Sequence, residues 1–273
     1  MIKNTTTTSS ELMKIQISSF ASVCAAYPFQ ARSLLQASEV VNSVIPNNLN
    51  HLKPEFTKGF VSYYRGLPAL LCLQPIYPLA VLGQKLMVSK LESKLDRKTV
   101  LAERMGCGFI IGLSTAVCCT PIELCVLARQ KKLNVTDIVR KEGWTRPFRG
   151  GTLIGFHNGI FFAGLTSMYK HFENLYWEKT RDATSAAPMM YHGFLAAATT
   201  SLICQPLMSP IRLAMVMRNS PNYPNWSAKT CLKNAWAKHG IRAFWAGTPA
   251  GLVQGTLGLM FFHNLFDYLT PKI

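Results

Sequence analysis

Two side chains of opposite charge stand inside otherwise apolar stretches of this 273-residue chain. Glu123 is the only acidic or basic residue between positions 107 and 128, and Arg212 is the only one between positions 193 and 217. A charge at the depth of a bilayer is costly, so it usually faces a polar cavity or a partner. Glu123 therefore has two candidate partners on neighbouring helices, Arg212 and Arg32.

Each of these charges follows a proline that interrupts an apolar run. Proline removes a backbone N–H and clashes with the carbonyl four residues earlier, so it kinks a helix. The setting occurs three times, about every 90 residues, which indicates three repeats of one unit. The expected kinks are at Pro28, Pro121 and Pro210. Two places after them stand Gln30, Glu123 and Arg212.

The composition is that of a helical membrane protein whose helices line a cavity. Hydrophobic residues make up 49% of the chain, charged residues make up 15%, and the mean hydropathy is +0.15. Several windows reach spanning length with few charges, and interior prolines and polar residues are typical of cavity-lining helices. We expect an all-α membrane protein with six transmembrane helices, at roughly residues 11–37, 65–90, 104–130, 148–177, 191–218 and 244–269.

The net charge of +16 is unevenly distributed among the polar connectors. The connectors at residues 32–65, 129–149 and 218–242 together carry a net charge of +12, whereas the other connectors and the two ends carry +4. This alternation is what the positive-inside rule predicts for six spans with both ends on the less basic side. It argues against nucleic acid as a partner, since a nucleic-acid-binding protein gathers its bases on one face.

The sequence does not favour an enzyme or a metalloprotein. Most of its eight cysteines lie in apolar segments, with no Cys-x-x-Cys spacing and no set of histidines beside them, so they are expected to be buried free thiols. No nucleophile–base pair and no phosphate-binding loop of the G-x-x-x-x-G-K type is recognisable. We expect no catalytic residue, no metal ligand and no cofactor.

The whole chain, residues 1–273, is expected to form a single domain of three repeats. The repeats are expected at residues 11–95, 100–180 and 189–270, after a flexible tail at residues 1–10. Two short amphipathic surface helices are expected at residues 135–141 and 227–238. Each even-numbered span begins after a short step that ends in glycine, at Gly66, Gly150 and Gly247.

This repeated pattern resembles the mitochondrial carrier family of inner-membrane solute transporters, here in a divergent form. The resemblance covers residues 11 to 270. In that family each odd helix carries a P-x-[DE]-x-x-[KR] signature, and a short matrix helix and an aromatic-[RK]-G step follow before the even helix. It implies a six-helix barrel with threefold pseudosymmetry, a central substrate cavity, and both termini in the intermembrane space.

The resemblance also implies a gate on the matrix side, and this chain has lost most of it. In the family, the acid at the third signature position and the base at the sixth form a ring of ion pairs. Only Glu123 matches, because the sixth positions hold Ser33, Val126 and Met215. One ion pair, Glu123 with Arg212 or with Arg32, would then close the gate. The candidate gate residues are Gln30, Arg32, Glu123 and Arg212.

The opposite gate of the family, [FY]-[DE]-x-x-[RK] on the even helices, is eroded as well. The fourth span has the acid and base exchanged, as Lys170 and Glu173, and the sixth span has Asp267 without a base. The second span, at residues 86–89, has neither an acid nor a base.

Substrate contacts in the family fall seven and eight residues after the glycine of each even helix. Here these positions are Leu73, Gln74, His157, Asn158, Gln254 and Gly255. They lack the clustered bases that a nucleotide or a di- or tricarboxylate requires, so a neutral or zwitterionic solute fits better. His157 is the one titratable side chain at these positions. The alternative is that His157 is a packing residue whose side chain is hydrogen-bonded within the protein.

The resemblance implies bound cardiolipin at the starts of the even helices. Free backbone N–H groups and a nearby cation suit a phosphate there, and plain anchoring at the membrane interface is the alternative. The candidate lipid-binding residues are Arg65, Gly66, Arg149, Gly150 and Gly247.

Two functions remain open from the sequence. The first is solute transport by alternating access in the inner mitochondrial membrane. The second is a non-transporting structural subunit of a larger inner-membrane assembly, such as a respiratory complex. The loss of paired charges at both gates favours the second function, whereas the kept prolines and glycines fit both.

Overall fold

The computed structural model of the protein describes residues 9–44, 64, 66–73, 75–130, 134–179, 186–219 and 227–269. Every element in these ranges is a helix, which confirms the all-α prediction. The α-helices are α1 (Ser9–Val44), α2 (Leu67–Leu71), α3 (Ile76–Leu95), α4 (Leu101–Ser114), α5 (Ala116–Gln130), α6 (Val135–Glu142), α7 (Gly151–Ala163), α8 (Tyr169–Lys179), α9 (Ala186–Asn219), α10 (Ala228–His239) and α11 (Thr248–Leu269). Two 3-10 turns, η4 (Arg146–Phe148) and η6 (Ile241–Trp245), and one π-helix, η5 (Gly164–Met168), complete the set.

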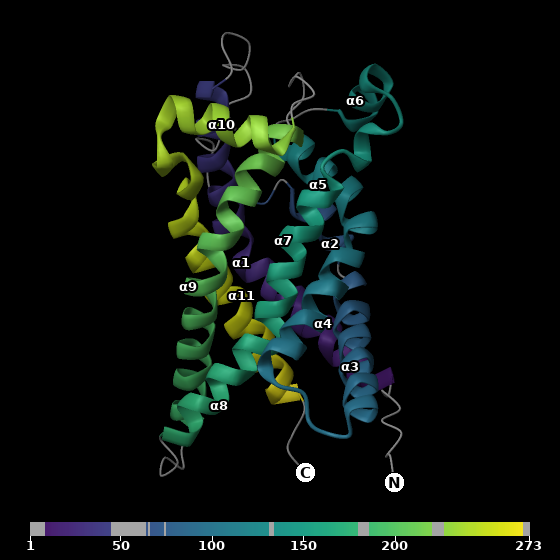
Figure 1. The fold of residues 1–273 in the computed structure, drawn as a ribbon, viewed down its shortest axis with the longest axis vertical. Helices are drawn as coiled ribbons and strands as arrows, with labels where there is room; N and C mark the ends of the chain where they lie inside the picture. The colour runs from purple at the N-terminus through teal and green to yellow at the C-terminus, as the bar shows by residue number, and fades with distance from the viewer. Residues whose placement is uncertain are drawn as a thin grey trace.

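The long helices pack in chain order around a closed ring (Figure 1). α1 contacts α3, α3 contacts α4, α4 contacts α7, α7 and α8 contact α9, α9 contacts α11, and α11 returns to α1. The start of α1, the turn between α3 and α4, and the end of α11 lie at one end of the ring, and α6 and α10 lie at the other (Figure 1). The two short helices agree closely with the predicted surface helices.

In the part of the chain that the structure describes, fewer helices are long and apolar enough to cross a membrane than the six that the sequence predicts. Among the described residues, Leu67–Leu95 and Tyr191–Arg218 are long and apolar enough by themselves. Leu101–Ser114 and Ala116–Val126 qualify together as a third span that is bent by 60°. The arrangement of six spans in three repeats stays a prediction.

The expected tail at residues 1–10 overlaps α1, which begins at Ser9, and residues 1–8 lie outside the described residues.

Pro28, Pro121 and Pro210 lie inside helices, and their expected kinks stay a prediction; a separate bend of 60° lies between α4 and α5. Pro28 and Pro210 lie within α1 and α9, and Pro121 lies within α5. The break between α4 and α5 falls at Thr115, six residues before Pro121. The Thr115 hydroxyl donates to the Gly112 carbonyl at 2.7 Å and accepts a side-chain bond from α7, so the polar groups at the break have partners.

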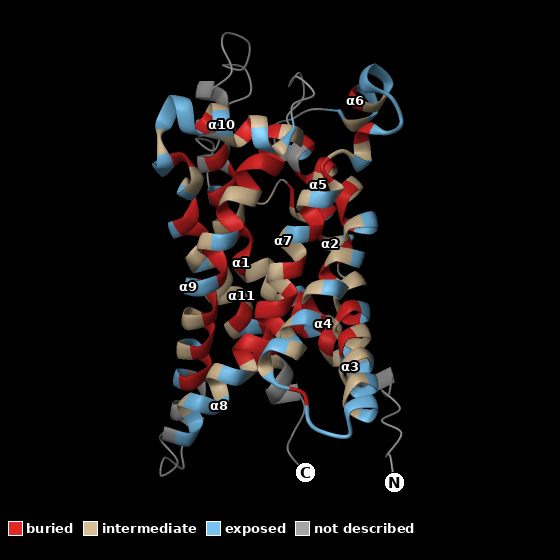
Figure 2. Cartoon of the chain, in the orientation of Figure 1, coloured by how far each residue is buried: buried red, intermediate tan, exposed pale blue. Residues whose placement is uncertain are grey.

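Large apolar side chains are exposed on the outer surface of the ring, among them Leu79, Ile110, Val117, Phe194, Leu202, Leu207, Val253 and Phe261. Figure 2 shows exposed residues along the outer sides of α9 and α3, while buried residues concentrate where helices face one another. An apolar outer face of this size is typical of a protein surrounded by lipid.

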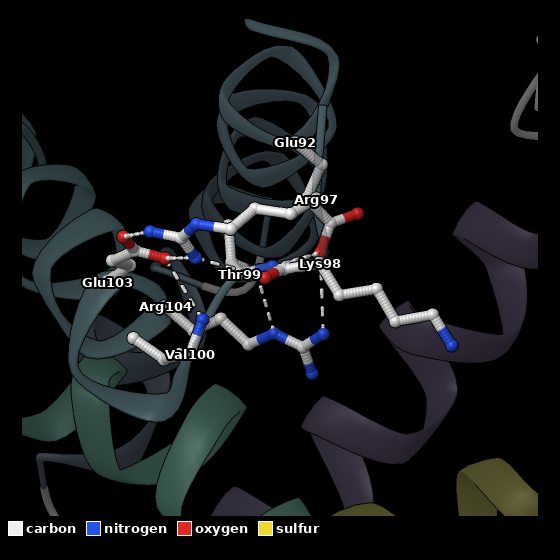
Figure 3. Close-up of polar contacts among 7 residues, drawn as sticks. All are labelled: Glu92, Arg97, Lys98, Thr99, Val100, Glu103 and Arg104. Atoms are coloured by element: carbon white, nitrogen blue, oxygen red, sulfur yellow. Dashed lines mark hydrogen bonds and ion pairs between the residues drawn. The ribbon is translucent and has the colours of Figure 1, made fainter. Parts of the chain in front are cut away.

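The turn between α3 and α4 is held by two carboxylates (Figure 3). Glu92 Oε1 accepts from the backbone N–H of Thr99 at 3.0 Å and from its hydroxyl at 2.8 Å. Arg104 donates to the same hydroxyl at 2.9 Å and to Glu92 at 3.4 Å. Arg97 makes two bonds to Glu103, and these raise the pKa of the Arg97 guanidinium. The turn therefore fixes the position of Arg104.

α4 and α7 cross closely because glycines face each other across their contact. A Cβ added at Gly112 would collide with the backbone carbonyl of Asn158, and one added at Gly159 would lie 2.7 Å from the ring of Phe109. Small residues at a helix crossing allow the backbones to approach, and this is a main source of packing energy between helices in lipid.

Gly112→Ala should destabilise the protein by about 1–3 kcal/mol, because the added methyl group overpacks the crossing. Gly106→Ala is the matched control on the same helix, since a Cβ there meets nothing within 4 Å. Thermal unfolding in detergent measures both variants. Equal melting temperatures for the two would contradict a close α4–α7 crossing.

Candidate solute-binding cavity

A cavity of about 130 Å³ lies inside the ring and is lined by residues of α1, α3, α5, α7, α9 and α11. It brings together seven of the residues singled out in the sequence: Gln30, Glu123, His157, Asn158, Arg212, Gln254 and Gly255. Leu73 is buried and lines a small recess that shares Glu123 and Asn158 with this cavity. Gln74 lies outside the described residues. Arg32 is exposed and does not line the cavity.

Arg212 is the centre of a buried hydrogen-bond network at the end of the cavity nearer to α10. Its guanidinium donates to the hydroxyl of Ser33 on α1 and to Gln205 Oε1 at 3.1 Å. The Ser33 hydroxyl donates in turn to the Gly247 carbonyl, just before α11, at 2.9 Å. We call Ser33, Gln205, Arg212 and Gly247 the Arg212 junction. It ties α1, α9 and α11 together.

The ion pair that the sequence predicted for Glu123 is not formed among the described residues. Arg212 points its donors at Ser33 and Gln205, which are close enough to satisfy it. The carboxylate of Glu123 has no hydrogen-bond or salt-bridge partner in the described part of the chain, although it interacts electrostatically with Arg212 across the cavity. The exposed Arg32 does not take the place of Arg212.

His157 and Asn158 have different roles, although the sequence placed them together. Asn158 Nδ2 donates to Thr115 Oγ1 at 3.0 Å, so this amide holds the bend between α4 and α5. His157 Nδ1 lies 3.4 Å from Asn158 Oδ1. That oxygen only accepts, so the network assigns the hydrogen to Nδ1 and leaves His157 Nε2 as an acceptor at the cavity wall.

Several buried polar atoms of the cavity wall have no hydrogen-bond partner in the described structure. They are His157 Nε2, Thr200 Oγ1, Ser201 Oγ and Gln254 Oε1. A buried polar group left without a partner costs about 1–3 kcal/mol, so such groups normally bond a ligand or water. The wall thus presents hydroxyl groups, acceptors and one free carboxylate to whatever occupies the cavity.

The opposite end of the cavity is lined by a layer of three apolar side chains that sequence reasoning missed. Val81, Leu165 and Phe262 line this cavity and also line a second cavity nearer to the α3–α4 turn. Each of them lies fifteen residues after the glycine that opens its even helix. This constant spacing is the one signal in the sequence from which the layer could have been predicted. The three residues themselves do not stand out, because they are apolar residues in apolar helices.

The eroded gate motif on α8 forms an ion pair within one helix. Lys170 Nζ lies 2.7 Å from Glu173 Oε2, and the Tyr169 hydroxyl donates to the same carboxylate at 3.2 Å. Among the described residues, α8 also contacts α11 through the ring of His263, which stacks on Tyr169 with 3.7 Å between ring centroids. The side chain of Asp267 lies outside the described residues.

Two of the candidate lipid-binding glycines have a backbone conformation that favours glycine. Gly150 and Gly247 have φ values of 87° and 86°, in the left-handed region that favours glycine, whereas Gly66 has a φ of −87°. Arg149 lies 3.5 Å from Glu142. Arg65 lies outside the described residues.

Ser33→Ala should lower the free energy of unfolding by about 1–3 kcal/mol, because it leaves both a guanidinium donor and the Gly247 carbonyl without a buried partner. Ser114→Ala is the matched control, since the exposed Ser114 bonds only within its own helix. The melting temperatures in detergent separate the two. A junction that contributes nothing would give both variants the same value.

Glu123→Gln should leave the melting temperature unchanged or slightly higher, because no ion pair is lost and a charge is removed from a poorly solvated site. The same unfolding assay measures it beside Ser33→Ala. A fall as large as that of Ser33→Ala would restore the pairing of Glu123 that the sequence predicted.

Comparison with known proteins finds one similarity, in the last third of the chain. The family model of the mitochondrial carrier protein matches residues 183–270, which coincide closely with the repeat predicted at residues 189–270. No curated protein matches the chain significantly. The family match covers one of the three predicted repeats, and over these residues the chain is similar to the mitochondrial carrier family.

Proposed function

We propose that this protein is a carrier of the inner mitochondrial membrane that moves a small neutral or zwitterionic solute by alternating access. The family match supports a solute transporter of the mitochondrial carrier family in general, and members of that family are transporters of the inner membrane and not enzymes. The closed ring of helices in chain order and the polar cavity within it support six spans around a central site.

The proposed class of solute rests on one observation. The carboxylate of Glu123, which has no partner among the described residues, lies in the same cavity as the guanidinium of Arg212. A zwitterion can place its ammonium group at Glu123 and its carboxylate at Arg212. The neutral acceptors of His157 and Gln254 would bind its remaining polar groups. A polyanion is disfavoured, because the cavity offers one guanidinium, already bonded twice, beside a carboxylate.

Alternating access needs two gates that close in turn, and the two ends of the cavity supply candidates. The Arg212 junction would close the end nearer to α10 by hydrogen bonds among three helices. The layer of Val81, Leu165 and Phe262 would close the other end by apolar contact. The ion pairs of the family's two gates would then be replaced by hydrogen bonds to neutral groups at one end of the cavity and by apolar contact at the other end.

The basic connectors support one orientation. We propose that both termini face the intermembrane space, so that α6 and α10 lie on the matrix side, where positively charged connectors are retained. We also propose cardiolipin at the starts of the even helices. A groove beside α2, lined by Arg129 and Asn134, offers a cation and a polar side chain next to the start of α6.

The second candidate is a non-transporting subunit of a larger inner-membrane complex. It is favoured by one observation: the Lys170–Glu173 pair lies within α8, so this pair does not itself link two helices. A structural subunit would need the ring but neither gate. It would not need polar groups without partners inside the cavity.

Reconstitution in liposomes tests transport directly. We expect saturable uptake of a zwitterionic amino acid from a panel of amino acids, nucleotides and carboxylates. Glu123→Gln should weaken it about tenfold or more, because a charge-assisted hydrogen bond to the ammonium group is lost. Asp137→Asn is the matched control, an exposed carboxylate on α6 outside the cavity.

Two results would contradict the carrier. One is no uptake of any panel member together with stoichiometric recovery in a large native complex, which is the outcome expected of the structural subunit. The other is uptake that prefers di- or tricarboxylates, which would leave transport standing but reject the zwitterionic solute.

A further inference from the structure

A second cavity, of about 240 Å³, lies beyond the apolar layer, toward the α3–α4 turn. It is formed by residues of α1, α3, α4, η5, α8 and α11. Its wall is largely apolar, with Ile15 and Val88 beside the shared layer. It has room for far more than one water molecule. The solute site proposed above does not use it.

Two buried side chains that line this cavity each have an acceptor atom without a hydrogen-bond partner in the described structure. Gln84 is 5% exposed, and its Nε2 donates to the Arg104 carbonyl at 3.1 Å and to Ser167 Oγ at 3.2 Å. The bond to a carbonyl fixes the amide orientation and leaves Oε1 buried without a partner. His263 is also 5% exposed. Its Nε2 lies 3.0 Å from the Leu165 carbonyl, so Nδ1 is the second free acceptor.

Three bases line the same cavity, namely Lys85, Arg104 and Lys170, and none of the described residues lining it is acidic. Arg104 is positioned by Thr99 and Glu92 of the α3–α4 turn, and Lys170 by Glu173 on its own helix (Figure 3 shows the Arg104 contacts). Both acids hold their bases from outside the cavity. We call the cavity with Gln84, Lys85, Arg104, Lys170 and His263 the basic pocket.

We propose that the basic pocket binds an amphipathic anion, a carboxylate or phosphate on an apolar body that also carries a hydroxyl group. The head group bonds Lys85, Arg104 and Lys170, because lysine and arginine are the natural donors to these anions. The apolar body lies against Val88 and the shared layer, and the hydroxyl donates to Gln84 Oε1 or His263 Nδ1. The ligand is either a free amphiphile or an anionic lipid, since both carry this chemistry.

The proposal goes beyond solute transport and does not depend on it. Val81, Leu165 and Phe262 line both cavities, whereas the three bases and the two acceptor side chains line only the second, so the proposed ligand does not share the polar groups of the central cavity. Failure of uptake in liposomes and failure of binding here are therefore distinct results.

Binding can be measured on the full chain in phosphatidylcholine nanodiscs by thermal shift and titration with 8-hydroxyoctanoate, octanoate and octanol. We expect stabilisation in that order, with octanol near zero. Arg104→Gln should weaken octanoate binding about tenfold, as expected for a lost bond to a charged group. Arg97→Gln is the matched control, an arginine of the same turn that does not line the pocket.

A comparison of 8-hydroxyoctanoate with octanoate tests whether the acceptors of Gln84 and His263 bind the hydroxyl group of the ligand. His263→Phe keeps the stacking on Tyr169 and should reduce the advantage of 8-hydroxyoctanoate over octanoate, while Lys90→Gln, an exposed base elsewhere on α3, should not. Tight binding of lysophosphatidate without binding of octanoate would identify a lipid as the occupant. Equal stabilisation by octanol and octanoate, or equal effects of Arg104→Gln and Arg97→Gln, would overturn the proposal.

Discussion

The burial of Arg212 is the constraint on which the rest of the structure depends. Removing a guanidinium from water costs several kcal/mol unless its donors are bonded, and Arg212 is only 6% exposed. Ser33 and Gln205 meet that need with neutral oxygens. The contact also explains why Gly247 must be glycine, because a Cβ there would lie 2.5 Å from the Ser33 carbonyl. One buried charge thus fixes the register of α1, α9 and α11.

The use of neutral partners for Arg212 leaves Glu123 free, and this decides what the cavity can bind. Had the two charges paired, the cavity would present only hydroxyls, amides and an imidazole. With Glu123 unpartnered, it presents a carboxylate and a guanidinium that interact through the space a solute would occupy. The far side of the apolar layer differs, because the described wall there carries bases and no acids. The two cavities are therefore suited to different ligands.

The sequence predicted the features that follow from spacing and composition. These are the all-helical class and the two surface helices, and seven candidate site residues line one cavity. The sequence did not predict the features that depend on contacts between residues of different helices. Ser33 was noted only as a missing base, although it is the partner of Arg212. The bend lies at Thr115, whose hydroxyl accepts a hydrogen bond from Asn158 of another helix, and no local pattern shows this contact. The π-helix at Leu165, which carries the carbonyl bonded by His263, has no local signature either.

Loss of the signature ion pairs is therefore a weak argument against a conformational switch. Two hydrogen bonds from a charged donor are worth about 3–6 kcal/mol together, and a shift from 1:99 to 99:1 between two states needs about 5.5 kcal/mol. The Arg212 junction alone comes near this range, and it is buried, so salt screens it little. A gate of this kind needs an interaction that is strong in one state and absent in the other, and a single guanidinium bridging α1 to α9 beside α11 meets that requirement without an acid at every repeat.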